Sequence, residues 1–219
     1  MDSGPAIELQ KAELFRVLGE DRLRAVQVRL HDRHFERQQV LYFEGNAADR
    51  LWVVRSGQVR LYKSSANGQL TTLDVLGPGE VFGAVSALES ELYPSSAEAV
   101  TRTMVWSLAR KHFLSLLDEE PRIGTEILQI LSRRLHEAHD RLRAFAHDPA
   151  PARLASELLR AARDGEAHVT RRALAEAAGT TVETAIRVLR RFERDGLLEG
   201  HVGQIRILDE ARLHEMAGR

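Results

Sequence analysis

Residues 169–207 constrain the fold most, because they contain two short helical segments, a tight turn and an alternating hairpin in the order of a winged helix-turn-helix. Thr170 can cap the first helix with its side chain. Gly179 supplies the turn between two crossed helices, and Gly196 stops the second one. The run from 200 to 207 (GHVGQIRI) then alternates as a hairpin wing does. This segment is predicted to be a compact unit built around one exposed helix.

The second helix of this unit is predicted to begin at Thr180. With Thr180 as N-cap, Glu183 occupies the third helical position and completes a capping box. An apolar stripe is predicted along one side, formed by Val182, Ile186, Leu189 and Phe192. Four arginines point largely elsewhere: Arg187, Arg190, Arg191 and Arg194. A helix held in this way can enter the major groove of double-stranded DNA.

Composition bounds what the rest of the chain can be. The 219 residues are 43% hydrophobic and 29% charged, as in a globular protein of one or two domains. No apolar run approaches the roughly 20 residues that span a bilayer, and the N-terminus lacks the features of a signal peptide. We therefore expect a cytoplasmic protein with no membrane partner. The net charge of -1 gives no global attraction to nucleic acid, so contact with DNA must come from a local arginine-rich face.

The chain contains no cysteine. This excludes disulfides, thiolate-bound zinc and iron–sulfur clusters held by cysteine.

Residues 34–110 are predicted to form a compact antiparallel barrel or roll. Short alternating runs are separated by glycines in this region: QVLYFE, LWVVRSG, QVRLYK, TTLDVL and MVWSLA. Before them, residues 12–30 show helical spacing in two pieces separated by Gly19. His31 and His34 lie where helix gives way to strand, and in a strand they would face opposite sides.

Residues 121–146 are predicted to form one long helix. Its apolar residues recur at steps of four and three: Ile127, Leu131, Leu135, Ala138, Leu142 and Phe145. A continuous seam of this kind favours a homodimer. Pro149 and Pro151 break the helix. The expected organisation is an α+β chain with a sensory β-roll and N-terminal helices at 1–120, a dimerisation helix at 121–147 and the winged helix-turn-helix at 148–219.

Taken together, these segments resemble the superfamily of the cyclic-AMP receptor protein and the fumarate–nitrate reduction regulator (CRP/FNR), bacterial transcription factors. Three segments carry the resemblance: GPGEVFG (77–83), YPSSAEA (93–99) and TTVETAIRVLRRFERDGLL (180–198). The second of them is similar to the branch of oxygen, nitric oxide and haem-linked regulators, here without the cluster cysteines. The resemblance implies a cyclic-nucleotide-binding type of roll, paired long helices, two recognition helices on a palindromic site, and RNA polymerase as a partner.

By the same resemblance, Glu183 and Arg187 read bases in a TTGA-like half-site, beside Val182 and Ile186. Phosphate contacts are expected from Arg171, Arg172, Arg190, Thr180, Thr181 and His201. Two simpler readings of the pair stay open. Glu183 can serve only the capping box, or Glu183 and Arg187 can form only a solvated pair four residues apart.

Cyclic AMP is not the expected effector. Members that bind cyclic AMP carry a Glu and an Arg at the positions held here by Ala84 and Ser95. The contact between that Arg and the cyclic phosphate is worth about 1.5–3 kcal/mol. No Lys or Arg occurs between Val81 and Val100 to replace it. The resemblance places the effector pocket at Gly83, Ala84, Ser95, Ser96, Ala138 and His139. Haem bound through His139, another small ligand, or no ligand remain as alternatives, the last giving a constitutively active regulator.

Two other classes of function were weighed. An enzyme built on the roll lacks the usual transition-metal ligands, because residues 35–110 contain neither His nor Cys. A ligand-binding or scaffolding protein would use its winged helix to contact protein, and would bind DNA without sequence preference or not at all.

Overall fold

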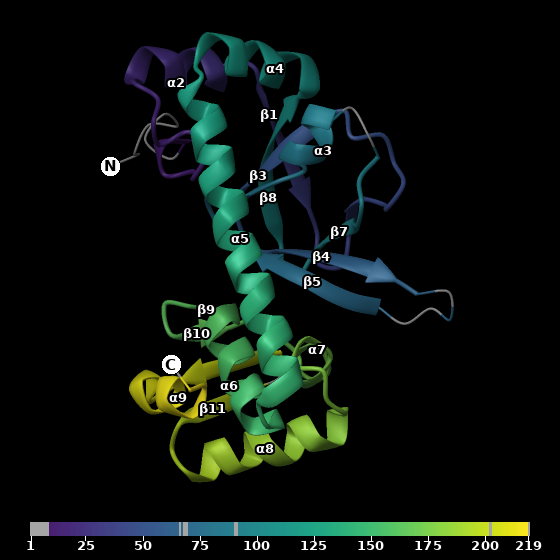
Figure 1. The fold of residues 1–219 in the computed structure, drawn as a ribbon, viewed down its shortest axis with the longest axis vertical. Coiled ribbons are helices and arrows are strands. Elements are labelled where there is room, and N and C mark those ends of the chain that lie inside the picture. Colours follow the sequence, from purple (N-terminus) through teal and green to yellow (C-terminus); the bar gives the residue numbers. More distant parts are fainter. Residues whose placement is uncertain (1–8, 66, 68–69, 90–91, 202, 219) are drawn as a thin grey trace. The chain divides into compact units, whose positions relative to one another are not determined.

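The computed structural model describes residues 9–65, 67, 70–89, 92–201 and 203–218 (Figure 1). The chain divides into two compact units between Leu135 and His136. This division falls inside the longest helix, α5 (Arg122–His147), which therefore contributes residues to both units. None of the helices in these ranges is both long and apolar enough to cross a membrane.

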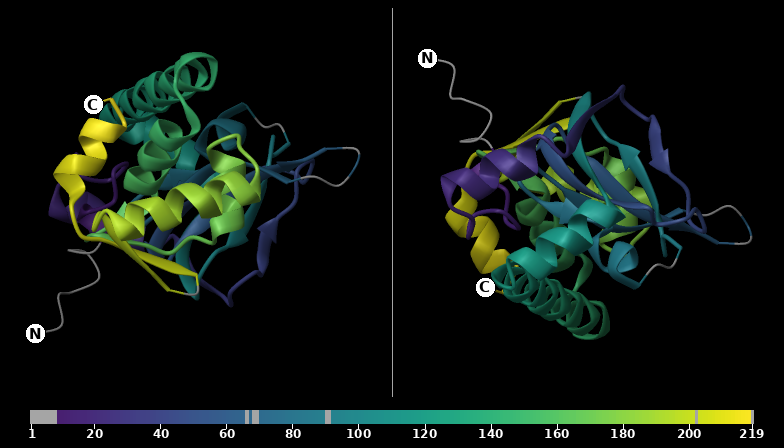
Figure 2. Two further views of the ribbon diagram at one scale, coloured as in Figure 1. Left: turned by 90° about the horizontal axis from the view of Figure 1, so that it is seen from below. Right: turned by 90° about the horizontal axis from the view of Figure 1, so that it is seen from above.

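The first unit is an antiparallel β-roll with helices, as predicted. One of its sheets has the order β1-β8-β3-β6, made of β1 (Leu30–Phe35), β8 (Thr103–Ala109), β3 (Arg50–Ser56) and β6 (Val81–Phe82). The other has the order β2-β7-β4-β5, made of β2 (Val40–Tyr42), β7 (Ser96–Ala99), β4 (Val59–Ser64) and β5 (Leu70–Leu76). Strands β4 and β5 extend away from the body of this unit (Figure 2).

All five runs predicted as strands are strands, and the described residues of this unit form three further strands that were not predicted. β6 and β7 are too short for an alternating pattern, and β1 is mostly exposed and polar. β1 contains His31 and His34, which pair with Ser107 and Met104 of β8. Because the two histidines are three positions apart on a strand, their imidazoles face opposite sides and cannot chelate one ion.

Two apolar clusters fill the first unit. The larger one joins the sheet of β3 and β8 to turns at residues 9–18, to α2 (Glu20–Gln27) and α4 (Arg110–Glu119), and to the first half of α5. The smaller one lies within the roll and is rich in aromatic rings. A short helix, α3 (Ala84–Glu89), follows β6. The larger cluster is what holds the roll to the start of α5, because it includes Ile123, Ile127 and Ile130 of that helix.

The apolar stripe of α5 differs from the prediction by one residue at its start. Ile127 is only 6% exposed and belongs to the core of the first unit, together with Ile123 and Ile130. The exposed stripe instead starts at Leu128 and comprises Leu128, Leu131, Leu135, Ala138, Leu142 and Phe145. These residues form two series at intervals of seven, which is the a and d pattern of a coiled coil. The helix thus has two apolar faces, and the prediction began on the wrong one.

The second unit is a winged helix-turn-helix, as predicted. After α5 come α6 (Ala150–Ala161), α7 (Arg171–Ala177), α8 (Val182–Arg194) and α9 (Glu210–Met216). The wing is a four-stranded sheet in the order β11-β12-β10-β9, made of β11 (Leu198–His201), β12 (Gln204–Ile207), β10 (Glu166–Ala167) and β9 (Ala162–Arg163). Pro149 is the N-cap of α6, and Pro151 lies in its first turn, where proline is tolerated. Helices α6 and α9 were not predicted, although Leu154 and Leu158 already show helical spacing.

Gly57 offers a test of packing in the roll. Gly57 and Gly45 both have positive φ, of 81° and 83°, but a Cβ at Gly57 would overlap the Arg102 carbonyl oxygen and the Thr103 side chain, whereas a Cβ at Gly45 has open space. Gly45→Ala should therefore lower the free energy of unfolding by about 1–2 kcal/mol. Gly57→Ala should cost about 1–3 kcal/mol more, because it overpacks the site as well.

Urea unfolding followed by tryptophan fluorescence measures both losses, because Trp52 and Trp106 lie in β3 and β8 of the first unit. Equal losses for the two variants would contradict the crowding at Gly57.

Candidate DNA interface and roll cavity

Helix α8 begins one residue later than predicted. Thr181, not Thr180, is its N-cap, and the Thr181 hydroxyl accepts a hydrogen bond from the Thr184 amide at 3.2 Å. Thr184 is therefore the third helical residue, and Glu183 is the second. The predicted capping box of Thr180 and Glu183 does not form. Either threonine can cap a helix, so the residue type does not decide between them.

The buried face of α8 also differs from the predicted stripe. Its buried residues are Ala185, Val188, Leu189 and Phe192. Val182 and Ile186 are half-buried and lie at the border of this face. The small Ala185 was overlooked in the sequence, although it lies at the centre of the packed side. The opposite side of α8 is turned to solvent, and it carries Glu183, Arg187 and Arg190.

Glu183, Arg187 and Arg190 have no ion-pair partner within the described ranges. Glu183 and Arg187 do not pair with each other, although they are four residues apart, and Glu183 accepts no hydrogen bond from the described residues. Neither the capping box of Glu183 nor the ion pair of Glu183 with Arg187 is therefore present in this structure. An open groove on this face is lined by Glu183, Ile186, Arg187, Arg190, Glu193 and Arg194.

The other residues expected to contact phosphates differ in their ion-pair partners and in their exposure to solvent. Arg171 pairs with Glu193 at 3.3 Å, and Arg172 pairs with Glu176 at 3.1 Å. His201 is exposed, with Nε2 3.8 Å from the Glu199 carboxylate. Thr180 is half-buried, and Thr181 is exposed. Arg190 is therefore the arginine of this set whose charge is not offset by a partner in the described structure.

The turn between α7 and α8 is held against the end of α5. Gly179 has φ +57°, and a Cβ there would overlap the ring of Phe145. The Arg153 guanidinium lies over the same ring, 5.7 Å from its centroid, and donates to the carbonyls of Ala178 (2.8 Å), Gly179 (3.2 Å) and Asp148 (2.7 Å). Phe145 was predicted as a seam residue. It remains 46% exposed, but it also supports the turn of the helix-turn-helix motif.

A cavity of about 170 Å³ lies in the roll beside the first half of α5. Its wall includes three of the residues expected there, Gly83, Ala84 and Ser95. Ser96 is not on the wall, because it faces β2 and accepts a hydrogen bond from the Glu44 amide at 2.9 Å. Ala138 and His139 are also absent from the wall and are exposed on the part of α5 that belongs to the second unit.

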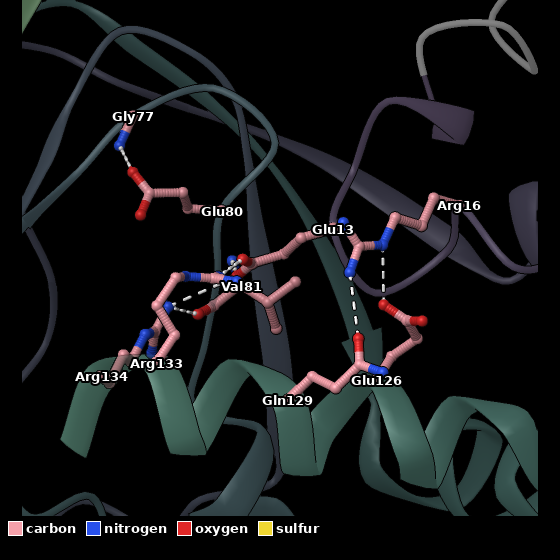
Figure 3. A network of polar contacts seen from close by, with 9 residues as sticks. All are labelled: Glu13, Arg16, Gly77, Glu80, Val81, Glu126, Gln129, Arg133 and Arg134. Carbon is pink, nitrogen blue, oxygen red and sulfur yellow. Dashed lines mark hydrogen bonds and ion pairs between the residues drawn. The ribbon is translucent and has the colours of Figure 1, made fainter. Parts of the chain in front are cut away.

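Arg134 is a cavity residue that the sequence analysis missed. It lies on α5, and its Nη2 donates to the Val81 carbonyl at 2.5 Å, with Glu13 Oε1 at 3.5 Å (Figure 3). Glu13 also accepts from the Val81 amide at 3.0 Å and contacts Arg133. Arg134 lies outside residues 81–100, the segment that contains no cation to replace the arginine of a cyclic AMP site. No local pattern in the sequence brings Arg134 to this loop.

Aromatic side chains form one side of the cavity. Tyr42 stacks on Tyr93 with ring centroids 3.7 Å apart. The Tyr93 hydroxyl donates to the Arg50 carbonyl at 2.7 Å and accepts from Trp52 Nε1 at 3.0 Å. Burial raises the pKa of Tyr42 and of Tyr93 above the ordinary value for tyrosine. Both phenols are therefore neutral at pH 7.

The cavity does not fit haem. Its wall contains no His, Cys or Met, and a tyrosine ligand would have to be a phenolate, which the raised pKa values of Tyr42 and Tyr93 oppose. Ala84 and Ser95 supply neither the carboxylate nor the cation expected at these two positions of a cyclic AMP site, and the cation on the described wall is Arg134 of α5.

Comparison with known proteins identifies the family. The cyclic nucleotide-binding domain matches residues 32–120, and the Crp-like helix-turn-helix domain matches residues 152–216. The chain is 34% identical to the cyclic AMP receptor protein of Thermus thermophilus over 180 aligned residues. The aligned region covers 81% of this chain and 83% of that protein.

The chain belongs to the CRP/FNR family. It is also 26% identical to the transcriptional activator protein FnrA of Stutzerimonas stutzeri, over 85% of this chain and 80% of that protein. The solved structure of FixK2 from Bradyrhizobium japonicum is similar, with a TM-score of 0.75, 26% identity, and coverage of 85% of this chain and 96% of that one. Members of the CRP/FNR family are transcription regulators that bind DNA as dimers, and they are not enzymes.

The position of the α8 cap can be tested with two adjacent threonines. Thr181→Ala removes the side chain that accepts from the Thr184 amide, so it should lower stability by about 1 kcal/mol. Thr180→Ala should have a much smaller effect, because Thr180 makes no capping hydrogen bond. Far-UV circular dichroism during thermal unfolding, without DNA, measures both. A larger loss of stability for Thr180→Ala than for Thr181→Ala would show that Thr180 is the N-cap, as the sequence predicted.

Proposed function

We propose that this CRP/FNR protein is a dimeric, sequence-specific regulator that reads a palindromic, TTGA-like site with Glu183 and Arg187. The observation that carries the proposal is that both side chains are exposed on one face of α8 without partners in the described structure. An exposed carboxylate can accept from cytosine N4, and an arginine can donate to guanine O6 and N7. The half-buried Val182 and Ile186 flank them and supply apolar contact to thymine methyl groups.

Phosphate contacts are proposed around this pair. Arg190 is the strongest candidate, because no acidic side chain of the described structure offsets its charge. Thr180, Thr181 and His201 contribute polar contacts. Arg171 and Arg172 can contribute only by leaving or sharing their carboxylate partners. Such contacts position the protein on DNA and carry no sequence information themselves.

The dimer is proposed to form along the exposed stripe of α5, from Leu128 to Phe145. Leu128, Leu135 and Leu142 are 68%, 56% and 67% exposed in the single chain. A stripe of exposed apolar residues at intervals of seven is typical of a coiled-coil seam, and a second copy of the chain would bury it. Pairing of two α5 helices would also place two α8 helices on one duplex, which a palindromic site requires.

A small molecule other than cyclic AMP, bound in the roll, is proposed to control this regulator, and RNA polymerase is proposed as its partner in transcription. The alternatives are a constitutively active regulator without an effector, and a scaffold whose winged helix contacts protein. The scaffold differs from the regulator in a measurable way, because it should show neither salt-dependent DNA binding nor sequence preference.

Base reading can be tested by fluorescence anisotropy with a TTGA palindrome and a random duplex. Arg187→Ala should weaken binding to the palindrome by at least about 30-fold, since the dimer loses two bidentate base contacts worth about 1–3 kcal/mol each, and should change binding to the random duplex little. Arg190→Ala should weaken binding to both and reduce the salt slope by about two, because each protomer loses one phosphate contact.

Arg191→Ala is the matched control on the same helix, because Arg191 is paired with Asp195 at 3.6 Å and should be nearly neutral. The base-reading role fails if Arg187→Ala and Arg191→Ala give the same small loss. Wild-type protein that does not distinguish the two duplexes would favour the scaffold.

The dimer seam can be tested by analytical ultracentrifugation. Leu135→Asp should convert the dimer to a monomer, because two charges would face each other in the seam. Leu208→Asp is the control, since Leu208 is 54% exposed but lies outside α5. Circular dichroism should show that both variants are folded. A Leu135→Asp protein that stays dimeric at low concentration would move the interface elsewhere.

A further inference from the structure

We propose that the roll cavity binds a small monoanion with an apolar body, a carboxylic acid being the typical case, and that Arg134 is the residue that recognises its charge. This inference rests on the proposed function, in which a small molecule controls the regulator. It adds the chemical class of that molecule.

The wall of the cavity is apolar apart from three side chains. Its apolar residues come from the roll, the N-terminal turns and α5, among them Leu14, Tyr42, Phe82, Tyr93, Ile127 and Ile130. The polar side chains are Ser86, Ser95 and Arg134, with the phenol groups of the two tyrosines beside them. A wall of this kind matches a ligand that is mostly hydrocarbon and has a polar group at one end.

Arg134 has donors left for such a ligand. Its Nη2 group makes the contacts with Val81 and Glu13, whereas Nε and Nη1 make no hydrogen bond within the described part of the chain (Figure 3). Guanidinium carries five N–H donors in a planar fork and suits a carboxylate. Ser95 is a buried residue whose hydroxyl has no hydrogen-bond partner among the described residues, so it can supply a further hydrogen bond.

The charged side chains near Arg134 favour a ligand that carries one negative charge. Glu13 is shared, because its carboxylate contacts both Arg133 and Arg134 and also accepts from the Val81 amide. One carboxylate therefore serves two guanidinium groups. The phenols of Tyr42 and Tyr93 are neutral at pH 7 and do not repel an anion.

The size of the cavity limits the ligand. Its volume of about 170 Å³ is below the roughly 300–1,000 Å³ of pockets for drug-sized molecules. The cavity therefore favours a ligand smaller than the drug-sized class, such as a monocyclic or short-chain acid.

The position of the cavity links the ligand to α5. Leu131 lines the cavity and is also part of the exposed stripe, and Arg134 directly precedes Leu135 of that stripe. A bound anion would thus contact the helix that is proposed to form the dimer seam. It can shift the regulator between states only if it binds one arrangement of α5 better than the other.

Isothermal titration calorimetry of the full chain tests the class of ligand. The probes are benzoate, phenylacetate and hexanoate, each compared with its uncharged amide, and cyclic AMP. At least one acid should bind in the millimolar range or tighter, and its amide should bind about 10-fold to 100-fold more weakly, because the charge-assisted contact is lost. Equal binding of acid and amide, or no binding by any of the acids, would overturn the proposal.

Two adjacent arginines provide the matched variants. Arg134→Gln should weaken binding of the acid about 10-fold to 100-fold, and Arg134→Lys should recover part of it. Arg133→Gln is the control, because Arg133 also contacts Glu13 but does not line the cavity. Equal losses for Arg134→Gln and Arg133→Gln would assign the effect to the Glu13 cluster and not to ligand recognition.

The same protein preparations are tested for binding to the TTGA palindrome without any acid. Sequence-specific DNA binding together with no response to the acids would overturn the ligand class and leave the regulator intact. Absence of specific DNA binding together with Arg134-dependent binding of an acid would overturn the proposed regulator and leave the ligand site.

Discussion

The rest of the structure depends on one helix, α5, which has two apolar faces that both need to be covered. On one side of α5, Ile123, Ile127 and Ile130 are buried in the core of the roll. On another side, leucines from Leu128 to Leu142 are exposed. Full burial of such a side chain is worth about 1.5–3 kcal/mol, so covering several of them would add appreciable stabilisation. The first face explains why the roll and the first half of α5 fold together. The second is the face proposed to pair with a second copy of the chain.

The polar cluster around Glu13 fixes the same helix in a different way. Glu13 accepts from the Val81 amide and contacts two arginines of α5, while Arg16 donates to Glu126 at 2.7 Å and to Gln129 at 3.3 Å (Figure 3). Apolar packing holds surfaces together without fixing their register, whereas hydrogen bonds and ion pairs are directional. The cluster therefore sets which residues of α5 face the roll. It also keeps the Arg134 guanidinium at the cavity, where its position would otherwise be free.

Sequence patterns predicted the features that depend on neighbouring residues. The five alternating runs, the turn at Gly179 and the wing all follow from local periodicity or backbone geometry. Errors arose where two adjacent residues satisfied the same rule, as with Thr180 and Thr181 at the cap or Ile127 and Leu128 on α5. Which of them is used depends on tertiary packing, which a local pattern does not contain. Arg134 was missed for a stronger reason, since its contact with Val81 joins residues 53 apart in the chain.

Phe145 and Arg153 suggest how a change in α5 can reach the recognition helix. The Phe145 ring occupies the space that a side chain at Gly179 would need, and Arg153 ties the carbonyls of Ala178 and Gly179 to the carbonyl of Asp148 at the end of α5. The turn before α8 is thus packed on α5 and hydrogen-bonded through one side chain. These contacts join the end of α5 to the turn before α8, so the two elements are held together within the second unit.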